Sequence, residues 1–165
     1  MTITPLHSRL DPHTLRAAFG AFPSGVVAVA AEVDDALVGM AASSFTSVSL
    51  EPALVSFSVA NTSSTWPVLR SSRHLGLSVL ADHHSDVCRQ LAGPADHRFE
   101  GLDTTSTDDG AVLLDDAVAT FDCTVHREIE AGDHTLVLLQ LHAVRDSGGA
   151  LPLVFHRSGF GRLAG

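Results

Sequence analysis

Residues 39–50 read Gly39-Met40-Ala41-Ala42-Ser43-Ser44-Phe45-Thr46-Ser47-Val48-Ser49-Leu50, an apolar strand that leads into small residues and hydroxyls. A second hydroxyl-rich run, Asn61-Thr62-Ser63-Ser64-Thr65-Trp66-Pro67, follows shortly after it. The apolar segment Leu54 to Val59 separates the two runs and is typical of a buried strand. Either run alone is also typical of an ordinary loop. Together they can gather many N–H and O–H donors at one place, which suits the phosphate of a nucleotide-like cofactor.

The segments around this stretch predict a mainly β protein. Val26 to Val33 and Ala36 to Ala41 are expected to form a hairpin about Asp34-Asp35. Further strands are expected at Leu54–Val59, Leu75–Leu80, Ala117–Ile129, Thr135–Arg145 and Leu153–His156. Because these six or seven strands are joined by short hairpins, we expect a closed antiparallel β-barrel rather than a doubly wound sheet. The absence of Gly-x-Gly-x-x-Gly after a strand also argues against a dinucleotide-binding fold.

Helices are expected only as connections, at His13–Phe19, Thr65–Ser71 and around Ser85–Ala92. Asp11 is the expected N-cap of the first helix, with Pro12 in its first turn. The apolar stripe of this helix consists of Leu15, Ala18, Phe19 and Phe22. Ser63 or Ser64 is expected to cap the second helix. The polar segment Asp96 to Asp109 predicts an irregular exposed loop near the entrance of the site.

The composition is that of one packed domain with an acidic surface. Of the 165 residues, 45% are hydrophobic and 18% are charged, which suits a single domain with a sizeable core. The formal net charge of −9 argues against nucleic-acid binding, which requires Lys and Arg to neutralise phosphates. The chain has no Lys and no Tyr, which excludes a lysine Schiff base, a P-loop lysine and a phenolic acid.

No segment predicts a membrane span or a secretion signal. The longest apolar run, Val26 to Ala31, is far shorter than the roughly 20 residues that a membrane helix needs. The start, Met1-Thr2-Ile3-Thr4-Pro5, lacks a basic region followed by an apolar segment. Without a Cys-x-x-Cys motif, Cys88 on a helix and Cys123 in a strand core are both expected to be reduced, in a cytoplasmic protein. A disulfide between them is the alternative.

The ten histidines do not form a recognisable metal motif. His126, His134 and His142 share strand parity, but no His-x-x-x-His and no His/Cys pairing appears. The adjacent His83 and His84 are expected to point to opposite faces, as neighbours on a strand do. We therefore expect no metal site. A serine hydrolase is not supported either, since Gly-x-Ser-x-Gly is absent.

The ordered set of segments resembles the short-chain NAD(P)H:flavin oxidoreductase family, which includes the reductase components of two-component flavin-dependent monooxygenases. The matching segments are Phe22-Pro23-Ser24-Gly25-Val26, residues 39–45, 47–52, 54–59 and 62–66, Gly132-Asp133-His134-Thr135 and Phe155-His156-Arg157. The resemblance implies one FMN-binding split β-barrel domain of Greek-key type over residues 1–165, with its core at about 13–163. It also implies a homodimer with the flavin near the subunit interface.

The resemblance further implies that FMN is held by the two hydroxyl-rich runs and by the strand between them. The implied residues are Ala41, Ala42, Ser43, Ser44, Ser47, Ser58, Asn61, Thr62, Ser64 and Thr65. The family often has Thr where this chain has Ala41, and often a basic residue near Asn61. A hydrogen bond to a charged group is worth about 1.5–3 kcal/mol, so losing both groups predicts FMN binding that is weaker by about tenfold or more.

Four residues are implied near the reacting rings. Ser24 matches a position at the reactive edge of the flavin, although a plain strand-entry serine fits equally well. His134 matches a residue that binds the nicotinamide without transferring a proton, and its alternative is a partly exposed histidine at a hairpin end. Arg157 and Phe160 match residues that cover the nicotinamide by charge or by stacking. No side chain is implied as an essential acid or base.

The resemblance implies an NAD(P)H-dependent FMN reductase. Hydride passes from nicotinamide C4 to flavin N5, and reduced FMN diffuses to a partner monooxygenase or halogenase. The choices between NADH and NADPH, and between FMN and FAD, stay open. Two alternative functions also stay open: an oxidoreductase that retains FMN and acts on an organic substrate, and a non-catalytic split-barrel protein that binds flavin or haem.

Overall fold

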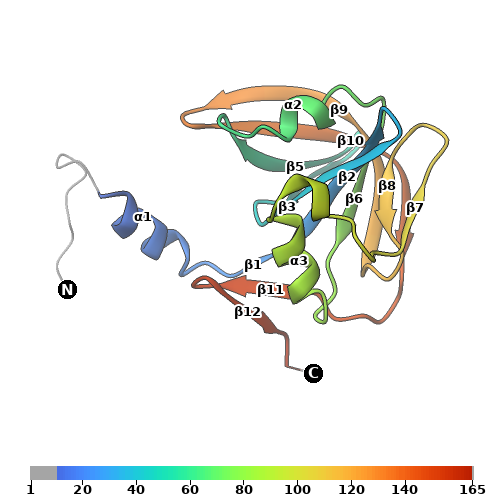
Figure 1. Ribbon diagram of the computed structural model, residues 1–165. Coiled ribbons are helices and arrows are strands. Elements are labelled where there is room, and N and C mark those ends of the chain that lie inside the picture. The colour runs from blue at the N-terminus through green and yellow to red at the C-terminus, as the bar shows by residue number, and fades with distance from the viewer. Residues whose placement is uncertain (1–10, 165) are drawn as a thin grey trace.

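The computed structural model describes residues 11–164, and seven antiparallel strands form its main sheet (Figure 1). In order across the sheet they are β3 (Ala36–Ala42), β2 (Val27–Val33), β6 (Leu75–Val79), β9 (Ala119–Ala131), β10 (His134–Asp146), β5 (Ala53–Ala60) and β4 (Thr46–Leu50). A smaller sheet contains β1 (Ser24–Gly25), β11 (Leu153–His156) and β12 (Gly159–Arg162). β7 (Thr104–Ser106) and β8 (Val112–Leu114) form a separate pair.

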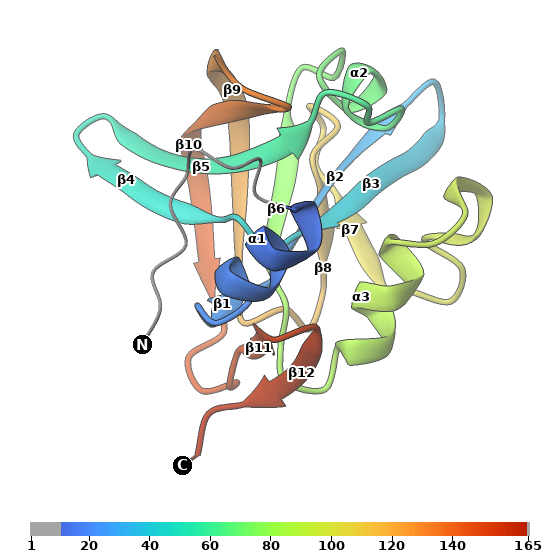
Figure 2. The ribbon, with the colours of Figure 1, turned by 90° about the vertical axis from the view of Figure 1, so that its left-hand side faces the viewer.

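The mainly β prediction is confirmed, but the main sheet is not closed. Its edge strands β3 and β4 make no ladder with each other, and Figure 2 shows them on opposite sides. The connection between them is fastened to β5, the neighbour of β4: the Ser44 hydroxyl accepts from the Ser58 N–H at 2.8 Å and donates to the Ser58 carbonyl at 3.1 Å. The expectation of a closed barrel was therefore wrong, because β3 and β4 both remain edge strands of an open sheet.

The strands that the sequence did not predict are short, polar or glycine-containing. They are β1, β4, β7, β8 and β12. The irregular loop expected over Asp96 to Asp109 is wrong in part, since a 3₁₀ turn (Ala95–His97) and β7 lie in this region. The Gln90 amide donates to the carbonyls of three residues there and so fixes its path. These residues are His97, Arg98 and Glu100.

The three expected helices are present as α1 (Pro12–Phe19), α2 (Trp66–Leu69) and α3 (Ser85–Leu91). Asp11 Oδ2 accepts from the Thr14 N–H at 3.3 Å, as an N-cap does. The Ser63 hydroxyl accepts from the Trp66 N–H at 3.2 Å at the start of α2. No helix in residues 11–164 is long and apolar enough to span a bilayer.

α1 stands away from the sheets (Figure 1), and its apolar stripe does not pack on them. Phe19 and Phe22 are 69% and 79% exposed. This stripe therefore has no apolar partner within the described chain. The segment Met1-Thr2-Ile3-Thr4-Pro5, in which we expect no secretion signal, lies outside the described residues.

The core lies between the faces of the curved main sheet and below α2. Phe57 is fully buried and meets the edge of Trp66, with ring centroids 5.4 Å apart. Trp66 Nε1 donates to Glu128 Oε1 at 2.8 Å, which satisfies the indole N–H. Cys123 is buried in β9 and Cys88 is half-buried on α3, both as free thiols, as predicted. Burial raises the pKa of Cys123 to about 12, so this thiol is a core residue and not a nucleophile.

Candidate functional site

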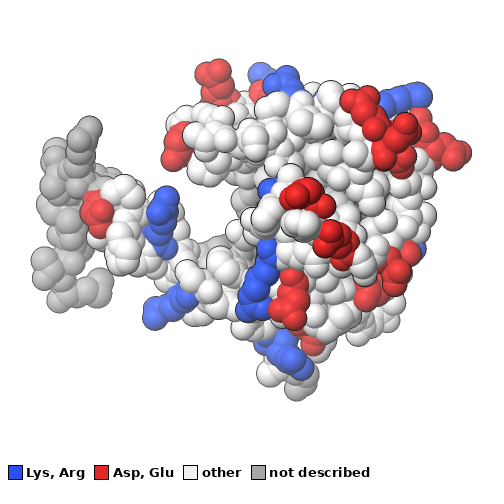
Figure 3. Space-filling view, viewed as in Figure 1, with Lys and Arg blue, Asp and Glu red and all other residues white. Residues whose placement is uncertain are grey.

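Three adjoining hollows meet where the β3–β4 connection, the segment before β1 and the β11–β12 hairpin come together. Their volumes are about 380, 520 and 270 Å³, and Ser43 lines all three. We call them the Ser43 groove. Its aromatic lining consists of Phe19, Phe22, Phe45, Phe155 and Phe160. Figure 3 shows the molecule hollowed between the α1 arm and the body.

A larger hollow of about 620 Å³ lies elsewhere, at the turn between β2 and β3. Its lining includes five carboxylates and one arginine, and that arginine is paired with one of the carboxylates. The carboxylates are Glu32, Asp34, Asp35, Asp108 and Asp109. Such an acidic surface repels phosphate. The Ser43 groove is therefore the better candidate for binding a phosphate-containing cofactor, although each of its three hollows is smaller.

The first hydroxyl-rich run contributes in two ways. The Ser44 hydroxyl is engaged with the backbone of Ser58, so Ser44 holds the turn in place. The hydroxyls of Ser24, Ser43 and Ser47 line the groove and have no hydrogen-bond partner among residues 11–164. These three groups are therefore available to a ligand. Ala41 and Ala42 line the apolar part of the groove.

The second hydroxyl-rich run lines none of the three hollows, and its side chains are partly engaged. The Asn61 amide donates to the Gly132 carbonyl at 3.2 Å, and its oxygen accepts from the Thr135 hydroxyl at 2.9 Å. Asn61 therefore fastens the turn between β9 and β10. Thr62 and Ser64 are exposed on the connection between β5 and α2, where their hydroxyls face solvent.

Arg98, which the sequence analysis did not single out, lies beside the groove without lining any of its three hollows. Its Nε donates to the Gly93 carbonyl at 2.9 Å, and its Nη1 donates to the Gly39 carbonyl at 2.8 Å and to the Thr65 hydroxyl at 2.9 Å. Nη2 has no partner within the described part of the chain, which leaves two N–H donors beside Thr65. Ala92, next to Gly93, lines the groove. Arg98 thus places a positive charge beside Gly39 and Thr65, from a segment that the sequence predicted to be a loop.

Three of the four residues implied near the reacting rings lie together. Ser24 and Arg157 line one hollow of the groove. Phe160 lines another, with the Arg89 guanidinium 5.0 Å from its ring centroid. His134 lines none of the three hollows. It begins β10, where its Nδ1 lies 2.7 Å from Asp133 Oδ1 and lowers the pKa of that carboxyl.

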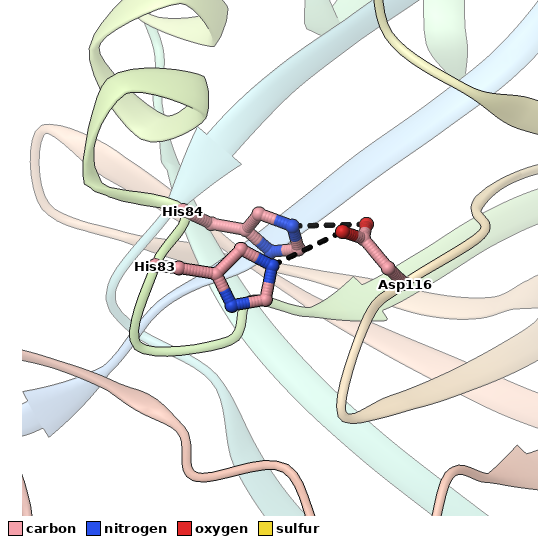
Figure 4. Close-up of side chains that lie close together, drawn as sticks. All are labelled: His83, His84 and Asp116. Atoms are coloured by element: carbon pink, nitrogen blue, oxygen red, sulfur yellow. Dashed lines mark hydrogen bonds and ion pairs between the residues drawn. The ribbon is translucent and has the colours of Figure 1, made fainter.

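Outside the groove, His83 and His84 both reach one carboxylate, Asp116 (Figure 4). Their Nε2 atoms lie 3.0 and 2.9 Å from the two Asp116 oxygens. The expectation that they point to opposite faces was wrong, because they lie in the turn before α3 and not on a strand. The Ala81 N–H donates to His84 Nδ1 at 3.0 Å, so Nε2 carries the proton of the neutral ring. To bind a metal ion, His84 Nε2 would need a free lone pair, but this atom carries a proton. His83 and His84 are instead both hydrogen-bonded to Asp116, an arrangement that we call the Asp116 clasp.

Replacing Asp116 with Asn is expected to remove a pH-dependent part of the stability. The bond to Asp116 raises the pKa of His83, and the bond from His83 lowers the pKa of Asp116. Their attraction is therefore lost as pH rises through the raised pKa of His83, or falls through the lowered pKa of Asp116. Burial lowers the pKa of His84, which opposes the clasp in acid.

Thermal unfolding of wild type and Asp116→Asn should therefore differ most at about pH 5–6 and less at about pH 8. The matched control is Asp86→Asn, which removes an exposed carboxylate that pairs with Arg89 on the same helix. Its effect should not follow this pH dependence. Equal differences for Asp116→Asn at both pH values would contradict the clasp.

Comparison with known proteins matches residues 19–164 to the family described as flavin reductase like domain. A flavin reductase of Pseudomonas putida is 36% identical over 96% of this chain and 94% of its own length. The chain spans 44–60% of the length of three further relatives.

Two solved structures are similar over nearly their whole length. The NADH:FAD oxidoreductase SgcE6 of Streptomyces globisporus, in complex with NAD and FAD fragments, is 31% identical with a TM-score of 0.88 over 99% of this chain and 98% of that one. BorF, the flavin reductase component of a bacterial two-component tryptophan halogenase, is 30% identical. Its TM-score is 0.85, over 93% of this chain and 98% of BorF.

Proposed function

The chain belongs to the family of flavin reductase like domains, and from that premise we propose that it is an NAD(P)H-dependent FMN reductase. As a member of this family it is an NAD(P)H:flavin oxidoreductase, and the choice of FMN is part of the proposal. The observation that carries the proposal is the Ser43 groove, which combines phenylalanine rings, unengaged hydroxyls and, beside it, the two open donors of Arg98.

The donor set fits a flavin mononucleotide. Its ring system is flat and apolar with polar edges, which suits Phe45 and Phe155 beside the hydroxyls of Ser24 and Ser43. Its phosphate suits the open guanidinium edge of Arg98, because charge-assisted hydrogen bonds to phosphate are strong. The Thr65 hydroxyl lies beside that edge and adds a donor.

The residues of the groove orient and shield the reactants rather than transfer protons. Phe45, Phe155, Ser24 and Ser43 would hold the flavin, which would supply a hydride acceptor for the reduced nicotinamide. Ser24 places a hydroxyl near that reaction, and Phe160 offers a face on which a nicotinamide ring can stack. Holding the two reactants against each other is the main catalytic contribution, since proximity replaces a bimolecular encounter. We assign His134 only to the hairpin beside the site.

We further propose that reduced FMN leaves this protein for a flavin-dependent monooxygenase or halogenase. BorF is the reductase component of such a two-component system, which supports this role for a chain of nearly equal length. Ala41 provides no hydroxyl to the flavin, which favours release over retention.

We propose that a second copy of the chain packs against the exposed apolar side chains of the α1 arm. Phe19 and Phe22 are exposed there, and Val48 and Leu50 are 49% and 97% exposed on the edge strand β4. Because Phe19 and Phe22 also line the groove, a homodimer would complete the flavin site. Light scattering should give twice the chain mass, and a monomer at micromolar concentration would contradict this.

Anaerobic stopped-flow absorbance tests the function directly. The protein with excess FMN is mixed with NADH or NADPH, and the visible flavin band is followed. Fast bleaching over many turnovers supports the reductase and identifies its donor. Bleaching of a single tightly held equivalent would instead favour an oxidoreductase that retains FMN. No bleaching with either donor would contradict both and leave a binding protein.

Replacing Arg98 with Ala is expected to weaken FMN binding by about tenfold or more, because a charge-assisted hydrogen bond to phosphate is worth about 1.5–3 kcal/mol. Fluorescence titration of FMN measures this. Riboflavin lacks the phosphate, so its affinity should fall far less and controls for loss of structure. Arg127→Ala, at an exposed arginine of β9, is the matched control variant. An equal loss for FMN and riboflavin would contradict a phosphate contact.

A further inference from the structure

Most arginines of this acidic chain are engaged with acceptors. Arg70, Arg73, Arg89 and Arg162 pair with carboxylates, and Arg98 and Arg145 donate to backbone carbonyls. Among residues 11–164, three arginines have neither an ion pair nor a side-chain hydrogen bond. They are Arg16, Arg127 and Arg157.

Two of these three lie together. Arg16 and Arg157 line one hollow of about 560 Å³ with His13 and Ser158, and no carboxylate is part of its lining. Both arginines also line the adjoining hollow that holds Ser24. This basic hollow is therefore continuous with the Ser43 groove.

The backbone holds the two arginines in this arrangement. The Arg157 N–H donates to the Gly20 carbonyl at 3.0 Å, and the Gly20 N–H donates to the Arg16 carbonyl at 2.8 Å. Arg157 and Ser158 have φ of +48° and +63°, which makes the tight turn of the β11–β12 hairpin. The turn thus brings Arg157 against the C-terminal end of α1.

Two guanidinium groups lining one hollow without an acceptor repel each other, and an anion relieves that repulsion. Asp133 lies within electrostatic reach of Arg16: the pKa of this carboxyl is lowered mainly by His134, and Arg16 is the smallest of the contributions. Asp133 forms no ion pair with Arg16 within 4.0 Å. Guanidinium forks match phosphate geometry, and two of them suit a diphosphate or a phosphate monoester.

We propose that His13, Arg16 and Arg157 bind a phosphate group of the reduced nicotinamide dinucleotide. This inference rests on the proposed function, since it assigns the co-substrate subsite of the same groove. The diphosphate is common to NADH and NADPH, whereas the 2′-phosphate belongs to NADPH alone. Either source has the chemistry that the hollow recognises.

Isothermal titration of the FMN-loaded protein with NAD⁺ and with NADP⁺ tests the subsite apart from turnover. Arg16→Gln and Arg157→Gln should each weaken binding by about tenfold, and Arg127→Gln should not. Equal losses for both dinucleotides identify the diphosphate, and a loss for NADP⁺ alone identifies the 2′-phosphate. Both outcomes support the subsite.

Two results would overturn the subsite. One is unchanged binding of both dinucleotides in the two variants. The other is a loss confined to FAD, which would assign the hollow to the adenylate part of a flavin. A protein that binds NAD⁺ through both arginines but does not reduce flavin would overturn the proposed function and leave the subsite in place.

Discussion

Gly76→Ala is expected to abolish stable folding. Gly76 is buried in β6, and β8 crosses it so closely that an added Cβ would lie 1.9 Å from the Val112 carbonyl oxygen, 2.5 Å from its carbon and 2.8 Å from its nitrogen. These are backbone atoms, so no side-chain rotation relieves the clash. Overpacking commonly costs about 1–3 kcal/mol when side chains can yield, and a rigid backbone contact should cost more. A domain stable by about 5–15 kcal/mol loses much of its margin.

Urea unfolding followed by circular dichroism measures this loss. Gly161→Ala is the matched control, because a Cβ at Gly161 meets nothing within 4 Å and its φ is not left-handed. That variant should stay within about 0.5 kcal/mol of wild type. A soluble Gly76→Ala protein with the wild-type midpoint would show that β8 does not lie on β6 as described.

Phe57→Ala is expected to cost about 3–5 kcal/mol, the usual range for a phenylalanine removed from a core. The ring is 0% exposed and rests against the edge of Trp66, so its removal opens a cavity below α2. Trp66 is the only tryptophan of the chain. Its fluorescence should therefore shift to the red in the folded variant, as water or a looser wall replaces the ring.

Trp66→Phe is the companion variant, since it keeps an aromatic ring and loses the 2.8 Å bond to Glu128. Glu128 keeps Arg70 as a partner at 2.9 Å, so the cost should be smaller, about 1–2 kcal/mol. Chemical unfolding followed by circular dichroism measures the loss of stability in each of the two variants. A larger loss for Trp66→Phe than for Phe57→Ala would mean that the indole bond, not the packing, stabilises this corner.

The local pattern of the sequence was sufficient for most elements. The Asp34-Asp35 turn, with φ of +52° and +61°, and its apolar flanks predicted the β2–β3 hairpin. Asp11 and Pro12 predicted the start of α1. These signals are local, because a turn or a cap depends on residues within a few positions of one another. β4 was missed because it is mostly exposed and rich in hydroxyls, which are also typical of a loop, and its register with β5 is irregular between Ser47 and Ser49.

The site was predicted in part for the same reason. The hydroxyl runs were visible because their members are neighbours in the chain, and Ser43 and Ser24 do line one groove. The place of Arg98 could not be predicted, because it lies 33 residues from Thr65 along the chain, in a segment without hydrophobic periodicity. Asn61 lines none of the three hollows, and its amide is engaged by the β9–β10 turn.

By itself, therefore, the sequence determined most of the elements, their order and the two donor-rich runs, all of which depend on contacts between near neighbours. Only the tertiary structure decided that the sheet stays open, that Arg98 stands beside Thr65, and that Arg16 and Arg157 share a hollow. The physical reason is that a charge acts on whatever the packing brings within a few ångströms, and packing depends on strand register and crossings that no local pattern encodes.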